Sequence, residues 1–361
     1  MLPLYQKLKT IFPGVILALI FCIFSQGINN LIAIEIFNTP KSPISTVLIA
    51  ILLGIIMGNA FTPRPGMMIG LDFTQQYILK LGVIFLGIRL SFSEFIKFGS
   101  IAIPLILVCI IGVLILIRIL VKKVSISSKM SYLIAIGTSV CGATAIVATA
   151  PVINAKKTEV AYAIANITLF GVIAMLIYPY FAEWYFNDAS LKAGLFLGTS
   201  IHETSQVAAA GLIYDQQFNS PETLNLATVT KLIRNTFLVI LIPLFAFLYN
   251  RGQTNDQKYS IFNIFPYFVL GFIGMIFVRN IGDQIFIDGT NSFNLWVNFI
   301  ELLKILATTF LTMAMAAVGI SINLSELRTM GYRPFLVGFI AAITVGLISL
   351  IYIETVLNFL I

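Results

Sequence analysis

Two stretches of the sequence decide the expected fold: Gly137-Thr138-Ser139-Val140-Cys141-Gly142-Ala143-Thr144 and Gly198-Thr199-Ser200-Ile201-His202-Glu203-Thr204-Ser205-Gln206. They lie inside the apolar segments 131–150 and 190–212, yet each has a centre of small and polar residues. A backbone cannot unwind against lipid, where unpaired N–H and C=O groups are costly, but it can unwind where it lines a cavity. We therefore expect two re-entrant or broken helices. Tight helix packing through small residues is the simpler alternative.

The composition around these stretches indicates a membrane protein. Of the 361 residues, 59% are hydrophobic and only 10% are charged, whereas soluble domains carry about 25% charged residues. The net charge of +7 does not predict nucleic-acid binding, because the basic residues form no cluster interleaved with aromatic residues. The three cysteines lie in apolar stretches and predict no disulfide framework.

The remaining apolar segments are long enough to span a bilayer, which takes about 20 residues. We predict nine spans, at 13–36, 44–60, 75–91, 98–121, 158–181, 222–249, 261–278, 295–320 and 335–360. Lys7 and Lys9 precede the first span, but no small-residue cleavage site follows it, so we expect an uncleaved first helix rather than a signal peptide. The expected fold is all-α, with about nine transmembrane helices plus the two broken segments.

Internal repeats strengthen the reading of broken helices. At an offset of 61, the residues Gly137, Thr138, Ser139 and Ala148 fall on Gly198, Thr199, Ser200 and Ala209. At an offset of 232, the residues Gly87, Ile88, Ser93, Glu94 and Gly99 fall on Gly319, Ile320, Ser325, Glu326 and Gly331. We predict one polytopic domain over 1–361 that contains a first repeat unit at 75–181 and a permuted second unit at 190–361. Glu94 and Glu326 are expected to be helix caps.

The distribution of Lys and Arg predicts the topology. With both broken segments re-entrant, 13 of the 22 cations lie on the cytoplasmic side, 5 lie outside and 4 lie within spans. Full crossing gives a slightly weaker 12 to 6. Only re-entrant segments make both repeats inverted, and an inverted pair that meets at mid-membrane is typical of secondary transporters. We expect a cytoplasmic N-terminus and an external C-terminus.

Two cations within a span predict an anion site. Lys231 and Arg234 lie roughly 15 and 20 Å into the span 222–249, at about 1.5 Å per residue, and share one helical face. Charges at that depth face a cavity or a partner. A structural ion pair with Glu203 is the alternative. The predicted substrate-binding residues are Ser139, Cys141, Thr144, Ser200, Ser205, Gln206, Lys231 and Arg234.

His202 and Glu203 form the expected tip of the second broken segment. Histidine titrates near neutrality, so this pair predicts proton coupling; a hydrogen-bonded structural pair is the alternative. His202 is the only histidine, which excludes a multi-histidine metal site and argues against a zinc protease. Glu301 and Lys304, three residues apart, are expected to form a local salt bridge. We predict no metal, no cofactor and no enzymatic activity.

These motifs carry a resemblance to a known family. The sequence from Gly137 to Ile146, that from Ile201 to Gly211 and that from Val229 to Arg234 resemble the YeiH-like bacterial membrane proteins of the sulfate exporter family. The resemblance covers nearly the whole chain. It implies a multi-pass protein of the bacterial inner membrane that carries sulfate or a related sulfonate.

Alternatives to a small-anion carrier remain. A proton- or sodium-coupled carboxylate transporter fits Lys231 and Arg234 equally well. A membrane-embedded enzyme or receptor is a third class, against which inverted duplication argues, because catalysis needs no access from two sides. The expected partners are a small anion, lipid and a coupling ion, H+ or Na+, and a homodimer is compatible with the sequence.

Overall fold

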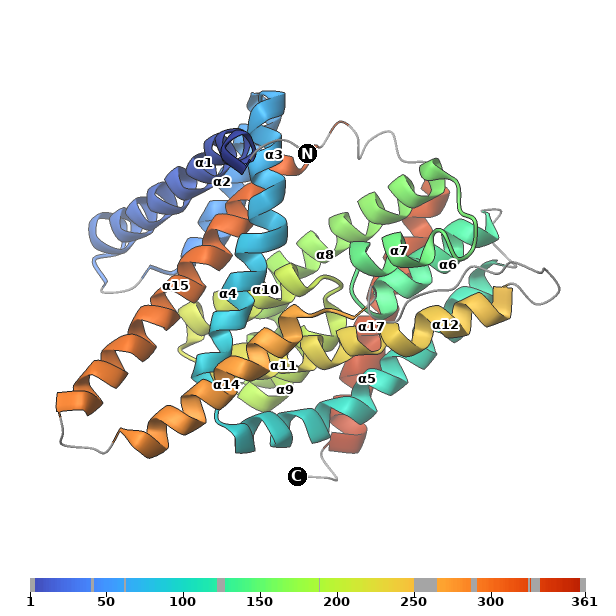
Figure 1. The fold of residues 1–361 in the computed structure, drawn as a ribbon. Helices are drawn as coiled ribbons and strands as arrows, with labels where there is room; N and C mark the ends of the chain where they lie inside the picture. The colour runs from blue at the N-terminus through green and yellow to red at the C-terminus, as the bar shows by residue number, and fades with distance from the viewer. Residues whose placement is uncertain are drawn as a thin grey trace. The chain divides into compact units, whose positions relative to one another are not determined.

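The computed structural model of the protein describes residues 4–39, 42–61, 63–121, 127–187, 189–249, 265–286, 291–323, 325 and 332–357. Over these residues the regular structure is entirely helical, and Figure 1 shows the course of the helices. The prediction of an all-α membrane protein is confirmed. The longer helices are α1 (Leu4–Leu31), α2 (Thr46–Ala60), α5 (Phe92–Val121), α8 (Lys157–Phe186), α14 (Phe268–Ile285), α15 (Asn291–Ser321) and α17 (Tyr332–Tyr352).

Within the described residues, each of the nine predicted spans overlaps a helical segment. In the described chain, seven helices are long and apolar enough to cross a membrane. The predicted span 44–60 is the shorter apolar helix α2, and the predicted span 75–91 lies in a continuous helical run at 65–89. That run comprises α3 (Pro65–Phe73), a π-helical turn (Thr74–Ile78), α4 (Leu79–Leu86) and a 3-10 turn (Gly87–Arg89).

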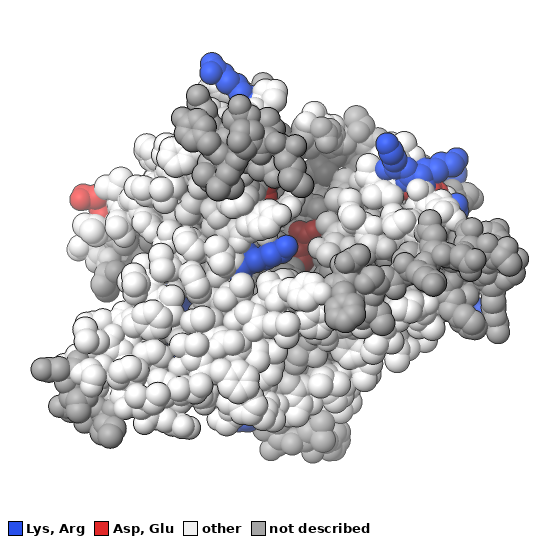
Figure 2. Space-filling model, in the orientation of Figure 1, with Lys and Arg blue, Asp and Glu red and all other residues white. Residues whose placement is uncertain are grey.

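The surface of the described residues is apolar, as lipid contact requires. Large side chains such as Trp184 and Leu295 are 73% and 71% exposed. On the face drawn in Figure 2, the charged residues form small separate groups on an otherwise uncharged surface. A soluble protein rarely exposes apolar surface on this scale, so lipid is the solvent that this surface fits.

The chain folds into two compact units. The first unit comprises Met1–Glu94, Leu212–Pro221 and Phe268–Glu326, and the second comprises Phe95–Gly211, Glu222–Tyr267 and Leu327–Ile361. This grouping follows packing and not internal similarity, so the repeat units 75–181 and 190–361 stay a prediction.

Close helix packing holds the first unit together. α15 lies against α2 and α4, and α1 lies against α3 (Figure 1). At the contact of α2 with α15, a Cβ added to Gly54 would come within 2.5 Å of the carbonyl oxygen of Ala316. Only glycine permits such an approach. A buried cluster beside this contact comprises Ala18, Cys22, Leu71, Met313, Ala317 and Ile320.

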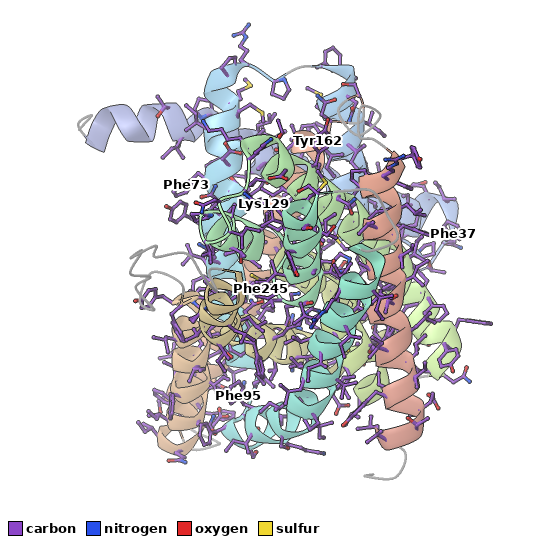
Figure 3. All side chains as sticks on the ribbon, turned by 90° about the vertical axis from the view of Figure 1, so that its right-hand side faces the viewer. Phe37, Phe73, Phe95, Lys129, Tyr162 and Phe245 are labelled. Atoms are coloured by element: carbon purple, nitrogen blue, oxygen red, sulfur yellow. The ribbon has the colours of Figure 1, made fainter. Side chains whose placement is uncertain are left out.

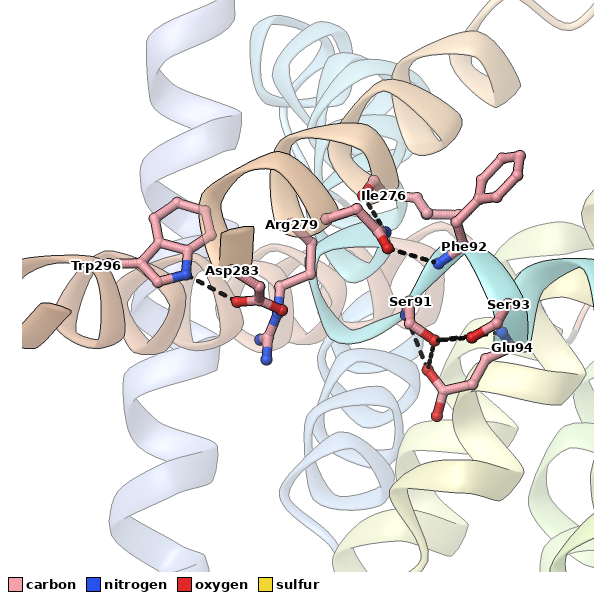
Figure 4. A network of polar contacts seen from close by, with 9 residues as sticks. Ser91, Phe92, Ser93, Glu94, Ile276, Arg279, Asp283 and Trp296 are labelled. Carbon is pink, nitrogen blue, oxygen red and sulfur yellow. Dashed lines mark hydrogen bonds and ion pairs between the residues drawn. The ribbon is translucent and has the colours of Figure 1, made fainter. Parts of the chain in front are cut away.

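Polar contacts gather around the start of α5 and the end of α14 (Figure 4). Ser91 caps α5, because its hydroxyl accepts from the Glu94 N–H at 3.2 Å and its own N–H donates to the Glu94 carboxylate at 2.8 Å. This reciprocal pair is a capping box, so the prediction that Glu94 is a cap is confirmed. Glu326, its partner in the predicted repeat, lies outside the described residues. Nearby, Asp283 binds both Arg279 and Trp296.

The first broken segment, in the second unit, is a re-entrant hairpin. It consists of α6 (Ser128–Ser139) and α7 (Ala143–Thr149), separated by three residues. Lys129, labelled in Figure 3, donates from Nζ to the carbonyl of Asn154 at 2.7 Å, so the two ends of the segment lie together. Gly137 also lies against the side chain of Ile146. Residues nine apart meet only when the chain turns back, since a straight helix would separate them by about 13 Å.

The second broken segment is a re-entrant hairpin as well. α9 (Ser190–Ser200) runs parallel to α11 (Pro221–Thr236), because Gly194 lies beside Leu226 and Gly198 lies beside Thr230. α10 (Thr204–Phe218) is separated from α9 by three residues and runs antiparallel to α11, because Gly211 lies beside Leu224 and the Asn235 amide donates to the Thr204 hydroxyl. α9 and α10 must therefore point in opposite directions.

α8 shows that the two hairpins enter from opposite ends. The base of the first hairpin meets the beginning of α8, where the Ser127 hydroxyl donates to the Glu159 carboxylate. The second hairpin starts just beyond the end of α8, where Phe186 and Phe196 are in ring contact. Both tips reach the middle of this 30-residue helix, since Gly137 lies beside Ile167 and the Gln206 amide donates to the carbonyl of Thr168. The two hairpins are thus inverted and meet beside the middle of α8, a helix long enough to cross a membrane.

Candidate functional site

Lys231 joins the tips of both hairpins. Its side chain, on α11, is 0% exposed. The ammonium donates to the carbonyls of Val140 at 2.8 Å, Ile201 at 3.0 Å and His202. These three bonds use all three donors of an ammonium group. One side chain therefore ties the first hairpin to the second.

Arg234 makes a second connection one helical turn further along α11. It is also 0% exposed. Its Nε donates to the carbonyl of Ser139 at 2.7 Å, and Nη2 donates to that of Thr138. Its Nη1 donates to the carbonyls of Thr199 and, at 3.4 Å, Ile201. The planar guanidinium can reach both hairpins at once because its donors fan out in one plane.

The oxygens that face these cations are the free ends of two helices. α6 and α9 stop beside the middle of α8, and the last carbonyls of each, those of Thr138, Ser139 and Thr199, bind Arg234 instead of a helical N–H. Each helix C-terminus carries roughly half a negative charge. The two ends together offset about one of the two positive charges, and direct hydrogen bonds hold both. Buried cations at this depth are costly without such partners.

Among the described residues the structure does not contain the predicted alternative, an ion pair of Lys231 or Arg234 with Glu203. The ion pairs of the structure include Arg89–Asp215, Lys192–Glu354, Arg279–Asp283 and Lys304–Glu301. Lys231 and Arg234 bind carbonyls instead. The predicted bridge between Glu301 and Lys304 is confirmed, at 2.7 Å.

Glu203 links the second hairpin to the start of α7. Its Oε1 accepts from the N–H of Ala143 at 3.2 Å. The side chain also packs against Gly142, which has a φ of +67° and would place a Cβ directly into the Glu203 side chain. Two features therefore require glycine at position 142: the positive φ of its backbone and the close contact with the Glu203 side chain. A carboxylate at a helix N-terminus is electrostatically favourable.

Several polar side chains at the tips have no hydrogen-bond partner among the described residues. Both ring nitrogens of His202 are buried in this state, and the residue is 1% exposed. The same holds for four hydroxyls, those of Thr138, Ser139, Ser200 and Thr230. An unsatisfied buried polar group costs about 1–3 kcal/mol. A small polar ligand or ordered water is the kind of group that satisfies them.

The structure separates the predicted substrate residues into two groups. It brings four of them together at the tips, Ser139, Ser200, Lys231 and Arg234, beside His202, which was predicted for proton coupling. Cys141 is a buried free thiol at the first break, and Thr144 is exposed. Ser205 is partly buried. The Gln206 amide accepts from the Glu203 N–H at 3.3 Å and donates to Thr168. Gln206 thus anchors the hairpin to α8, and the roles of all these residues in binding stay predictions.

Three supporting contacts were not predicted. Asn235 donates to the Thr204 hydroxyl at 2.8 Å, and the hydroxyls of Thr199 and Ser349 are 2.7 Å apart. Asn166 donates to the carbonyl of Pro334 at 2.6 Å and is 0% exposed. The available signal was a polar residue inside an apolar span. Asn166 and Asn235 both fit that criterion, but it did not identify their partners.

Counted in their ordinary ionised forms, the side chains at the tips have one more positive than negative group. Lys231 and Arg234 contribute two positive charges, and Glu203 as a carboxylate contributes one negative charge. The two helix ends and the two helix starts at the tips carry roughly half a charge each, of opposite sign, and cancel. A single positive charge remains near mid-membrane. No group of three or more metal-binding side chains occurs in the part of the chain that the structure describes.

Comparison with known proteins places the chain among membrane proteins. It is 34% identical over 321 residues to the UPF0324 membrane protein of Fusobacterium nucleatum, covering 88% of this chain and 91% of the relative. It is 37% identical over 300 residues to a UPF0324 membrane protein of Streptococcus agalactiae, covering 83% and 86%. A relative in Clostridium tetani is 29% identical over 350 residues, covering 93% and 94%. No solved structure matches the chain.

A family model described as Conserved hypothetical protein 698 matches residues 13–338. The match includes both hairpins and α11 with its two buried cations. The chain therefore belongs to the Conserved hypothetical protein 698 family of membrane proteins.

Proposed function

We propose that the protein is a secondary transporter of a small anion. The observation that carries the proposal is the meeting of two inverted hairpins on Lys231 and Arg234, with one net positive charge at the tips. Inverted broken helices that meet at mid-membrane are the architecture of alternating access. The unpartnered groups of His202, Ser139 and Ser200 would supply hydrogen bonds to the bound anion.

The proposed substrate is sulfate or a sulfonate. The resemblance of the tip motifs to YeiH-like sulfate exporters supports this choice. Hydroxyl and imidazole donors suit an oxyanion, which accepts several hydrogen bonds at once. A carboxylate is the second candidate, because it shares the charge and the oxygen acceptors. We further propose transport rather than catalysis. Inverted hairpins allow access to a site from both sides of the membrane, and a catalytic reaction needs access from one side only.

A proton is the coupling ion that the site supports best. In other transporters, Na+ binds the carbonyls at half-helix C-termini. Here the nitrogens of Lys231 and Arg234 take those carbonyls. His202 and Glu203 are the titratable side chains that remain at the tips, and they are proposed to carry the proton.

The proposed location is the bacterial inner membrane with a cytoplasmic N-terminus. The excess of Lys and Arg on the side of the N-terminus supports this orientation. A reporter that is active only in the cytoplasm, fused after Ile361, should give no signal. A strong signal would contradict an odd number of crossings.

Transport is tested by counterflow in proteoliposomes. Vesicles loaded with unlabelled sulfate should accumulate labelled sulfate several-fold above protein-free vesicles, and external methanesulfonate should compete. Lys231→Ala should abolish accumulation, whereas the matched control Lys192→Ala, which removes a partly exposed ion pair with Glu354 in the same unit, should not.

Competition with succinate separates the two substrate classes. If succinate competes and methanesulfonate does not, the carboxylate candidate is the better one. If folded protein exchanges no anion of either class, the proposal is refuted.

A further inference from the structure

We propose that the carbonyl oxygens at the ends of α6 and α9 form a binding site for a small monovalent cation, and that the Lys231 ammonium is its permanent occupant. The site itself is independent of the proposed function. Only its consequence for transport, namely that no metal ion is needed at this position, rests on that function.

The geometry around the Lys231 nitrogen is that of a cation site. Three carbonyl oxygens surround it, from Val140, Ile201 and His202, which come from two separate chain breaks. All three residues are at least nine-tenths buried. Val140 and Ile201 directly follow α6 and α9, and His202 is the next residue, so the oxygens belong to the chain just beyond the two helix C-termini. Carbonyl oxygens gathered in this way replace the hydration shell of a cation.

The alternative is that Lys231 acts only as a structural hydrogen-bond donor. In that case a neutral donor could replace it, and free cations would have no effect on the variant. The charge decides between the two readings. In Lys231→Ala the partly negative carbonyl oxygens of Val140, Ile201 and His202 would face a buried space. A free cation that enters this space supplies both the donors and the positive charge that these dipoles attract, whereas a neutral donor supplies only the former.

The distances predict which cations fit. The Val140 and Ile201 oxygens lie 2.8 and 3.0 Å from the nitrogen, which are ordinary N–H···O lengths. Lys231→Ala leaves a space that opens onto the same oxygens. Ammonium and methylammonium should fill it best, Na+ less well, and choline not at all, because its methyl groups donate no N–H bond.

The experiment is thermal unfolding of purified Lys231→Ala in ammonium, methylammonium, sodium and choline chloride at equal ionic strength. A bound cation stabilises by RT ln(1 + [L]/Kd), so ten times Kd should raise Tm by about 2 °C. Methylammonium and ammonium should give this rise with saturation. The wild type, whose site is filled, should respond equally to all four salts.

Two further variants complete the test. Lys192→Ala removes a lysine of the same unit that binds no such carbonyls and should respond like the wild type. Lys231→Gln supplies a neutral donor; it should fold more readily than Lys231→Ala and still be stabilised by ammonium. The proposal is overturned if neither variant at position 231 is stabilised more by ammonium or methylammonium than by choline. It is also overturned if neither folds in any of the salts.

These results are independent of transport. Anion exchange can fail while the cation dependence of Lys231→Ala holds, which would refute the proposed function alone. Conversely, the wild type could exchange sulfate while cations have no effect on the variants. That result would support the proposed transport function and refute the proposed cation site.

Discussion

The two hairpins occupy equivalent places in the second unit, yet they differ in chemistry. The first breaks at Gly142 in a left-handed conformation, whereas the second breaks through an extended Ile201. The first offers carbonyls and hydroxyls, and the second adds His202 and Glu203. The carboxylate of the second reaches the start of α7 in the first. Similar sequences at an offset of 61 therefore give similar backbone breaks. The titratable side chains His202 and Glu203, however, come from the second hairpin only.

The strongest test of the comparison removes the residue that serves both hairpins. Arg234→Ala should free the ends of α6 and α9 together and lower the free energy of unfolding by about 3–5 kcal/mol, the typical cost of breaking a buried charge interaction. Thermal unfolding measures the loss. Arg234→Lys should cost less, because it keeps the charge and loses the planar donors.

Arg279→Ala is the matched control for Arg234, since it removes a half-exposed ion pair in the first unit. It should change stability by less than about 1 kcal/mol. Equal losses in Arg234→Ala and Arg279→Ala would show that the carbonyl contacts of Arg234 contribute little.

A second test acts on the first hairpin alone. Gly142→Ala forces a side chain into the left-handed region and against Glu203, and should cost about 1–3 kcal/mol. The double variant Gly142→Ala, Glu203→Ala should recover the part of this loss that comes from the contact. Gly27→Ala, at a position with open space, should be neutral or slightly stabilising. No difference between the two glycine variants would remove the special role of Gly142.

A third test acts on the charge of the second hairpin. Glu203→Gln keeps an oxygen that can accept from the Ala143 N–H, so the fold should be retained. The site gains one positive charge, and sulfate affinity measured by calorimetry should rise about tenfold, or about 1.4 kcal/mol. An amide does not titrate, so the pH dependence of transport should also flatten. Weaker sulfate binding by the folded variant would contradict an anion site at the tips.

The smallest expected effect on stability concerns Thr138 and Thr199, which occupy matching positions in the repeat at an offset of 61. The Thr199 hydroxyl binds Ser349, whereas the Thr138 hydroxyl has no partner among the described residues. Thr199→Val should cost about 0.5–1.5 kcal/mol, and a double-mutant cycle with Ser349→Ala should assign most of it to this pair. Thr138→Val should be neutral or stabilising. Equal costs at both positions would show that the hairpin environments differ less than the contacts imply.

The sequence allowed much of the fold to be predicted. Apolar length identified nine helical segments, and the small polar residues around Gly137 and Gly198 identified both breaks, because lipid forbids unpaired backbone at such places. The burial of Lys231 and Arg234 followed from their depth in a span. Their hydrogen-bond partners could not be predicted. Every residue has a backbone carbonyl, and the residue type does not show which carbonyls lack a partner within a helix.

The link between Glu203 and Gly142 was also beyond prediction. It depends on how two segments 60 residues apart meet in space. The pairing of Lys231 with Glu203 was a reasonable hypothesis from charge alone. In the structure the two cations bind backbone carbonyls at the ends of α6 and α9 instead, and such carbonyls carry no formal charge that the sequence could display.

The long-range contacts of α11 have a consequence for biosynthesis. Val140 and Lys231 are 91 residues apart, and Thr138 and Arg234 are 96 apart. The first hairpin therefore enters the membrane while the residues that neutralise its end are still to be translated. Until Arg234 leaves the ribosome, the end of α6 must be held by water or by the insertion machinery. Truncated nascent chains that stop before residue 231 should accordingly expose this hairpin to proteases, and chains that extend beyond α11 should protect it.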